Sequence, residues 1–140
     1  MPTSSQAATE FSLNRIGQIA VTIDDLDRAV RFYRDTLGMR FLFQAPPGLA
    51  FFECGGIRLM LSRPEGAAAS GASSILYYAV PDIHAAYDTL ASRGVQFEDT
   101  PHLVAKMPDH DLWMTFLRDS ERNLIGLMCE MPRAGADTAR

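Results

Sequence analysis

The sequence is poor in cysteine, in long apolar runs and in clustered positive charge, and each shortage excludes a class of protein. Its two cysteines, Cys54 and Cys129, are too few for the disulfide framework of a small secreted domain. No apolar run approaches the roughly 18 residues needed to cross a bilayer. The first residues, MPTSSQAATEF, lack the basic and apolar regions of a secretory signal. We therefore expect a cytoplasmic protein with reduced thiols that neither crosses nor enters a membrane.

Positive charge is also scarce. Thirteen Lys and Arg residues stand against 17 Asp and Glu, which gives a formal net charge of −4. The basic residues are scattered along the chain, whereas a protein that binds nucleic acid or an anionic membrane needs a clustered basic surface. We expect no nucleic acid and no membrane among its partners.

What remains is an ordinary globular composition. The 140 residues are 47% hydrophobic and 21% charged, which suits one domain and excludes collagen-like or disordered chains. We predict a single domain over residues 15–131, between aperiodic tails over 1–14 and 132–140. A stretch rich in Pro, Gly, Ala and Ser divides this domain. It predicts a first module over 15–62, a linker over 63–72 and a second module over 73–131.

The two modules repeat one pattern. Each begins with an apolar, β-rich run and continues with a helical stripe that starts at an aspartate cap and stops at a glycine. Three extended segments then follow the helix. The residues that open the two helices, Leu26 and Ile83, are 57 positions apart, and the last strands contain the similar words IRLM and IGLM.

This repeat predicts an α+β fold. Each module is a βαβββ unit whose helix covers one face of its sheet and leaves the other face open. Two such tandem modules placed edge to edge form a curved, cup-shaped mixed sheet with the helices outside. The alternative is a ferredoxin-like α+β sandwich in which the similarity of the two halves is accidental.

With this pattern, the sequence resembles the vicinal oxygen chelate (VOC) superfamily, which includes glyoxalase I, bleomycin-resistance proteins and extradiol dioxygenases. The resemblance rests on IGQIAVTIDDLDRAVRFYRDTLGM, on FLRDSER and on the final strand NLIGLMCE, with Arg122 where glycine is common. It covers about residues 15–131 and implies the paired modules. It implies no single reaction, because one fold supports many chemistries.

The resemblance also implies where a metal would bind. In the metal-using members, the first and fourth strands of each module each supply one His, Gln or Glu ligand. These positions correspond here to Gln18, Arg58, Ile75 and Gly126. Only Gln18 offers a donor oxygen, and Arg58 is a fixed cation that repels a divalent ion. Because such a site normally needs three protein ligands, we expect neither a metal nor another cofactor.

Strand alternation indicates which side chains line the cup. A guanidinium suits a carboxylate or phosphate on the ligand, and the remaining candidates surround it with aromatic and polar groups. Trp113 is included because the row Asp111, Trp113 and Thr115 is the more polar face of its strand. Structural alternatives remain open: an ion pair of Arg58 with Glu53 or Glu130, and core positions for the aromatic residues. The predicted ligand-binding residues are Gln18, Arg58, Tyr77, Trp113 and Glu130.

A polar segment over 100–111 is interpreted as a loop. It contains His102 and His110 close to carboxylates, and a histidine beside a carboxylate can act as a general base. The two histidines are therefore the candidate catalytic residues. The alternative is a solvated turn without a chemical role.

Three functions remain, in this order. The first is a homodimeric protein that binds a small organic ligand in the cup without a metal, similar to bleomycin-resistance proteins. The second is a metal-dependent lyase, isomerase or dioxygenase with an atypical ligand set. The third is a degenerate module that mediates protein interaction or regulation. The atypical ligand set of the second would draw on Gln18, His102, His110 and Glu130.

Overall fold

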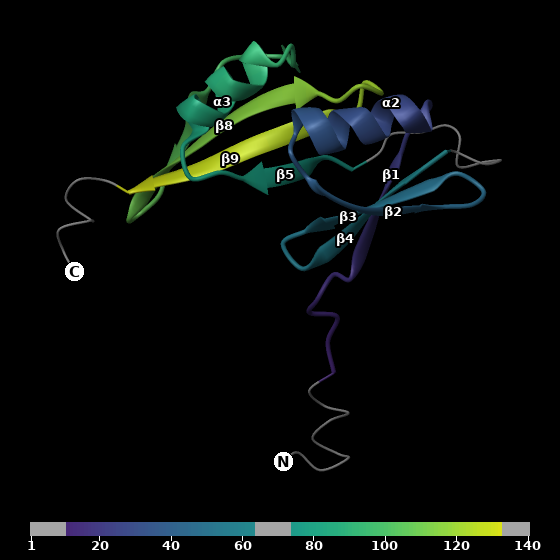
Figure 1. Cartoon of the computed structure of the whole chain (residues 1–140). Helices are drawn as coiled ribbons and strands as arrows, with labels where there is room; N and C mark the ends of the chain where they lie inside the picture. Colours follow the sequence, from purple (N-terminus) through teal and green to yellow (C-terminus); the bar gives the residue numbers. More distant parts are fainter. Residues whose placement is uncertain (1–10, 64–73, 133–140) are drawn as a thin grey trace.

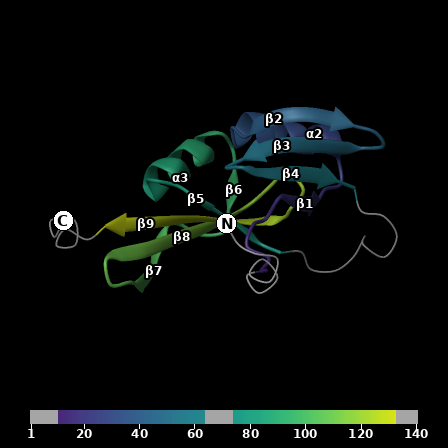
Figure 2. The ribbon, with the colours of Figure 1, turned by 90° about the horizontal axis from the view of Figure 1, so that it is seen from below.

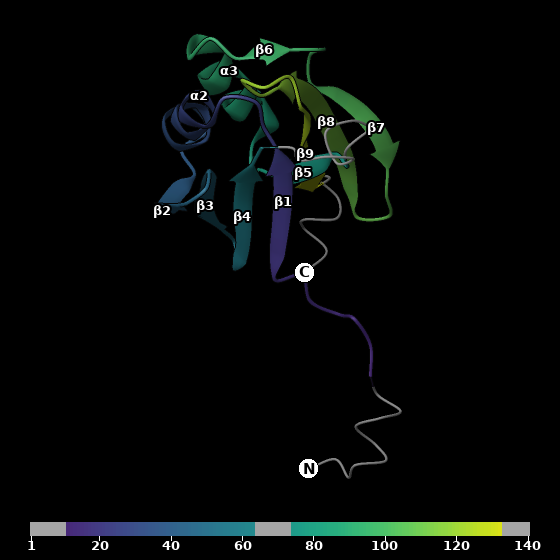
Figure 3. The same ribbon diagram turned by 90° about the vertical axis from the view of Figure 1, so that its right-hand side faces the viewer.

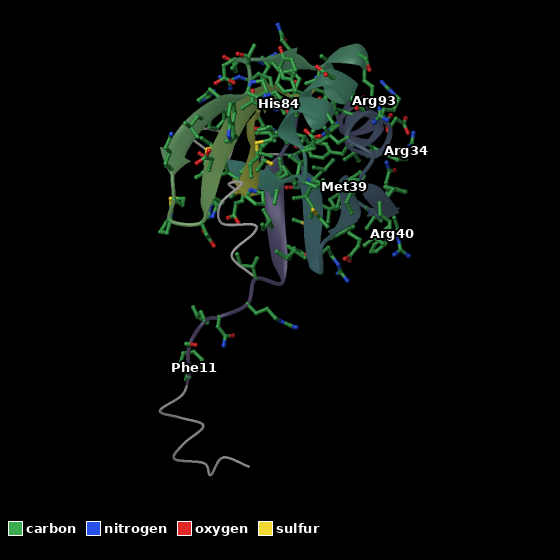
Figure 4. All side chains as sticks on the ribbon, turned by 90° about the vertical axis from the view of Figure 1, so that its left-hand side faces the viewer. Phe11, Arg34, Met39, Arg40, His84 and Arg93 are labelled. Carbon is green, nitrogen blue, oxygen red and sulfur yellow. The ribbon has the colours of Figure 1, made fainter. Side chains whose placement is uncertain are left out.

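The computed structural model describes residues 11–63 and 74–132 of the chain. Most of the predicted linker over 63–72 and most of both predicted tails lie outside the described residues. Residues 11–17 form an exposed segment without regular structure that leads away from the body, and Phe11 lies on it (Figures 1 and 4). No described helix is long and apolar enough to span a bilayer.

The structure contains two modules of strands and helices. The elements of the first module are β1 (Gln18–Thr22), α2 (Leu26–Arg31), the π-helix η1 (Phe32–Thr36), β2 (Arg40–Ala45), β3 (Leu49–Cys54) and β4 (Ile57–Ser62). Those of the second are β5 (Leu76–Ala79), α3 (Ile83–Ser92), β6 (Gln96–Phe97), β7 (His102–Lys106), β8 (His110–Arg118) and β9 (Leu124–Pro132).

Each module forms its own sheet. The first has the strand order β1-β4-β3-β2, and the second has the order β5-β9-β8-β6, with β7 also paired to β8. In both sheets the first strand of the module is parallel to the last, and the other pairs are antiparallel. Figure 3 shows the sheets side by side under α2 and α3, with β1 and β5 on facing edges. The predicted α+β fold of paired modules with outer helices is confirmed.

One predicted loop is a strand. The segment over 100–111 was expected to be irregular, but its residues 102–106 form β7, antiparallel to β8. Its polar ends suggest a loop, whereas the apolar centre, Leu103 to Ala105, supports a strand. The second module therefore has one strand more than the repeat predicts.

A single core lies between the helices and the two sheets. The predicted helical stripe is buried at Ala29, Val30 and Tyr33, and Ile83 anchors α3. These side chains belong to one cluster with buried residues from β3, β4, β8 and β9. Because both modules contribute to one cluster, neither half is expected to keep its structure alone.

Hydrogen bonds from one turn, residues 119–123, tie the second module to the first. The Tyr33 hydroxyl donates to Asp119 Oδ2 at 2.7 Å, and the Asn123 side-chain amide donates to the Thr22 carbonyl at 2.9 Å. Glu121 accepts from the backbone N–H groups of Asp24 and Asp25 at 2.9 and 2.8 Å. This 119–123 turn therefore fixes how the first sheet stands relative to the second.

The turn contains a left-handed residue, from which a stability prediction follows. Arg122 has φ of +69°, at the position where the family commonly has glycine. A Cβ is disfavoured at this φ, so Arg122→Gly is expected to raise the free energy of unfolding by about 0.5–1 kcal/mol. Urea denaturation measures the change. The control Arg122→Ala keeps the Cβ and should lack this gain; equal stability of the two variants contradicts the prediction.

Candidate functional site

The candidate site is the side of the two sheets that faces away from the helices, here called the open face (Figure 2). On β1, Gln18, Ala20 and Thr22 are exposed on this face, while the alternate residues pack inward. On β5, Tyr77 is exposed, and its neighbours Leu76 and Tyr78 pack against the core. The alternation of each strand thus separates a core side from an accessible side.

On the first sheet, the open face carries a cation above aromatic rings. Gln18 and Arg58 are direct partners in the parallel β1–β4 register. The Arg58 guanidinium carbon lies 5.7 Å from the centre of the Phe51 ring, which is stacked on Phe43 at 4.8 Å. The Gln18 amide nitrogen lies 3.8 Å from the Met60 sulfur. These contacts place one positive charge over Phe51, which is only 9% exposed, and next to the exposed ring of Phe43.

The ion pair considered for Arg58 is not formed. Glu53 accepts a hydrogen bond from the Gly56 N–H at 2.7 Å, and Glu130 lies close to a histidine. Within residues 11–63 and 74–132, Arg58 has no carboxylate within ion-pair distance. Its charge is therefore accessible to an anion from solution.

On the second sheet, two rings cover a glycine. The Tyr77 and Phe116 rings meet edge to face with their centres 5.7 Å apart. A Cβ on Gly126 would lie 2.6 Å from Tyr77 Cδ2 and 3.2 Å from Phe116 Cε1, so any side chain there displaces the Tyr77 ring. Gly126 is thus the position that allows the two rings to lie against the sheet.

The register corrects one predicted equivalence. Gln18 pairs with Arg58 in the first module, but Gly126 pairs with Tyr77 in the second, and Ile75 precedes β5. The connection from strand to helix is two residues shorter in the second module: Gln18 precedes Leu26 by eight positions, and Tyr77 precedes Ile83 by six. Transferring the 57-residue offset of the helices to the strands was therefore wrong, and Tyr77 is the structural equivalent of Gln18.

The placement predicted for Trp113 is also wrong. Trp113 packs against the core, with its ring 5.3 Å from that of His84 on α3, so it lies on the helix side of β8. Thr115 on the same row is fully buried, and its hydroxyl donates to Asp99 Oδ1 at 2.8 Å. The Thr115 hydroxyl has an internal partner, and polarity alone therefore indicated the wrong face of the strand.

The other row of β8 faces the open side, and sequence reasoning missed it. Phe116 lies opposite Gly126 and Met114 opposite Met128 in the β8–β9 register. Leu112, Met114 and Phe116 form the less polar row of β8, so polarity predicted this row to lie in the core. A usable signal was the glycine on β9, because a missing side chain leaves room for a ring from the neighbouring strand.

The structure places the two candidate histidines in separate surroundings. His110 Nδ1 lies 2.7 Å from Asp109 Oδ1, and its Nε2 lies 3.9 Å from Glu130 Oε2. His102 Nδ1 lies 2.9 Å from the Thr100 carbonyl. In the described parts of the chain, no group of three or more His, Cys, Asp or Glu side chains is arranged to hold a metal ion.

The cysteines contribute no reactive group to the open face. Burial, and then the neighbouring Glu53, raise the pKa of the Cys54 thiol, which disfavours the nucleophilic thiolate. Cys129 is 2% exposed, and its sulfur lies 3.5 Å from the Pro81 carbonyl. Both residues are free thiols.

Comparisons with known proteins agree with this architecture. The chain is 28% identical over 124 residues to the uncharacterized protein YraH of Bacillus subtilis, covering 77% of this chain and 92% of that protein. It superposes on lactoylglutathione lyase from Agrobacterium tumefaciens with a TM-score of 0.66 and 22% identity, covering 82% and 92% of the two chains. It superposes on TnmS3, an antibiotic-binding protein from Streptomyces sp. CB03234, with a TM-score of 0.68 and 22% identity, covering 89% and 100%.

The two structural likenesses have low sequence identity and show the fold alone. The sequence pattern of one family, in contrast, matches residues 15–126, which is most of both modules. This chain belongs to the Glyoxalase/Bleomycin resistance protein/Dioxygenase superfamily.

Proposed function

We propose that this protein binds a small organic anion with a planar aromatic part on its open face, and that it does so without a divalent metal. The observation that carries the proposal is the Arg58 guanidinium over the Phe51–Phe43 stack, exposed and without a carboxylate partner among the described residues. A guanidinium recognises a carboxylate or phosphate, and the exposed Phe43 ring offers a surface for a flat apolar group.

The donor chemistry of the four strand positions argues against a metal ion there. Gln18 contributes one amide oxygen, but the residue paired with it is the cation Arg58. In the second module the paired positions hold Tyr77 and Gly126, and the Tyr77 ring covers the glycine. One amide oxygen and one phenol hydroxyl beside a fixed positive charge do not fit a divalent ion, and the proposal therefore assigns these positions to an anion instead.

One relative supports a binding role. TnmS3, whose fold this chain shares, is an antibiotic-binding protein. Lactoylglutathione lyase, with a similar fold, is an enzyme, so the fold alone does not choose between the two roles. The choice of ligand binding here rests on the residues of the open face.

The proposal predicts that binding of an aromatic anion depends on Arg58. With the fluorescent probe 2-naphthoate, Arg58→Met is expected to weaken binding about 10- to 100-fold, because one charge-assisted hydrogen bond contributes about 1.5–3 kcal/mol. Methionine preserves much of the apolar stem above Phe51. Fluorescence titration of the purified full chain measures both dissociation constants.

The matched control is Arg31→Met, which removes one positive charge from the exposed side of α2. It should leave the dissociation constant within about twofold, since surface charges a Debye length away are screened. The neutral analogue 2-naphthol should bind wild type and Arg58→Met alike. Equal losses in both arginine variants would mean that only net charge matters, and the proposed site would then be wrong.

The proposal includes a homodimer in the cytoplasm. Exposed apolar side chains on or near the open face, among them Phe43 and Tyr77, are 46% and 45% exposed, which favours association. Light scattering coupled to size-exclusion chromatography tests the dimer, and a monomer at micromolar concentration contradicts it.

A further inference from the structure

A cavity lies on the opposite side of the sheets from the open face, and it is open to solvent along α3, where Asp82, Ala85, Thr89 and Arg93 are exposed. It has a volume of about 410 Å³ and lies between α3, β5 and the chain that follows η1. This volume falls in the range of small-molecule pockets, about 300–1,000 Å³. Its walls are mostly apolar and come from both modules, with Leu37 and Met39 on one side and Leu90, Leu117 and Leu127 on the other.

The cavity follows one side of α3. Asp82, Ala85, Thr89 and Arg93 all line it, at a spacing of three or four residues that places them on one helix face. From Asp82 to Arg93 the helix measures about 16 Å. The residues in the middle of this face, Ala85, Ala86 and Thr89, are small and leave the space beside them open. The cavity is therefore elongated and extends along α3 from its first residues to its last.

The two ends differ in charge. At the first end, the Asp82 carboxylate is occupied, because it accepts the N–H groups of His84 and Ala85 at 3.1 Å each. At the other end, Arg93 donates through Nη1 to the Thr36 carbonyl at 2.8 Å and has no carboxylate within ion-pair distance among the described residues. Figure 4 shows Arg93 and Met39 where the first helix meets the second module. An anionic group is favoured at this second end.

A buried donor lies in the wall. Tyr78 lines this cavity and also a smaller one of about 140 Å³ between β1 and β5. Its hydroxyl oxygen is buried and has no hydrogen-bond partner within the described ranges.

We propose that this cavity is a second binding site, for an amphiphilic carboxylate whose apolar chain lies along Ala85, Ala86 and Thr89 and whose carboxylate meets Arg93. The site is independent of the open face. It takes a flexible aliphatic acid, whereas the open face takes a flat aromatic one. Because residues of both modules form its walls, an occupant stabilises the packing of one module on the other.

The test uses decanoate below its critical micelle concentration, with calorimetric titration of the full chain. Wild type should bind it, and Ala85→Trp, which adds an indole to the wall of the cavity, should weaken binding by at least about tenfold. The matched control is Ala91→Trp, because Ala85 and Ala91 are both exposed alanines of α3 but only Ala85 lines the cavity. It should change affinity less than about twofold.

Two further arms separate this site from the open face. Arg93→Met should weaken decanoate but not decanol, because only decanoate carries the charge. Arg58→Met should weaken 2-naphthoate and leave decanoate unchanged, so failure of one site is distinguishable from failure of the other. The inference is overturned if wild type does not bind decanoate, if Ala85→Trp binds it as tightly as wild type, or if Arg58→Met removes the binding.

Discussion

Replacing Asp119 by alanine is expected to lower the free energy of unfolding by about 3–5 kcal/mol. Asp119 is only 5% exposed, and its two carboxylate oxygens accept four hydrogen bonds. The donors are the Tyr33 hydroxyl at 2.7 Å, the N–H groups of Glu121 and Asn123 at 2.8 Å, and the Asn123 side-chain amide at 2.9 Å. Alanine leaves these donors without their acceptor in a site that little water reaches.

The consequence extends to the candidate site. The Tyr33–Asp119 bond joins η1 to the turn before β9, and the same contact contributes to the raised pKa of Tyr33, whose main cause is burial. Urea denaturation of Asp119→Ala measures the loss. Tyr33→Phe removes one of the four donors and should cost only about 1 kcal/mol. If Asp119→Ala costs no more than Tyr33→Phe, the network does not hold the modules as described.

Lowering the pH is expected to weaken the protein through Glu121. This side chain is 1% exposed. Burial alone would raise the pKa of its carboxyl, but hydrogen bonds from Arg28, from Ser120 and from the N–H groups of Asp25 and Asp24 outweigh burial and hold the pKa at about 2. The folded protein therefore binds this proton only at a lower pH than the unfolded chain does. In the unfolded chain the carboxyl has its ordinary pKa of 4.5.

The sign follows from linkage. A depressed carboxyl pKa gives stability that is complete above pH about 4.5 and is lost as the pH falls toward 2. Between pH 7 and pH 3 this one group should account for a loss of about 2 kcal/mol. Urea denaturation at both pH values tests it: in Glu121→Gln, which cannot ionise, the acid-induced loss should be smaller by that amount.

The matched control is Asp35→Asn. Asp35 pairs with Arg34 at 2.8 Å, but both side chains are well exposed, and such pairs contribute little. Its acid-induced loss should therefore be the same as that of wild type. An unchanged loss in Glu121→Gln would contradict the role assigned to this carboxylate.

Local patterns predicted the elements of this fold well because they act over a few residues. An aspartate cap opens each helix as expected: Asp25, rather than Asp24, and Asp82 each accept a backbone N–H of the first turn. β3 and β4 are two of the three extended segments predicted after the first helix, and the PPG turn before β3 and the GG turn between the two strands delimit them. The repeat then indicated the architecture, because each module leaves one sheet face uncovered.

The candidate site was harder to predict, because its geometry depends on register between distant strands. A two-residue difference in one connection moved the equivalent of Gln18 from Ile75 to Tyr77. Trp113 lies on the same face of β8 as Thr115. The hydroxyl of Thr115 donates to Asp99, which belongs to another segment, so the strand's own pattern does not show that this face is buried. The interaction of the 119–123 turn with the first helix links residues more than 80 positions apart, which no local pattern contains.

The central claim is that Arg58 makes the open face an anion site that works without a metal. The most direct measurement is titration of 2-naphthoate into protein purified without a chelating tag and dialysed against EDTA, and then into the same protein with added Ni²⁺ or Zn²⁺. The account predicts the same dissociation constant under all of these conditions. It also predicts weaker binding in Arg58→Met and unchanged binding in Gln18→Ala. Binding that requires the added ion, together with stoichiometric metal by elemental analysis that disappears in Gln18→Ala, would contradict it.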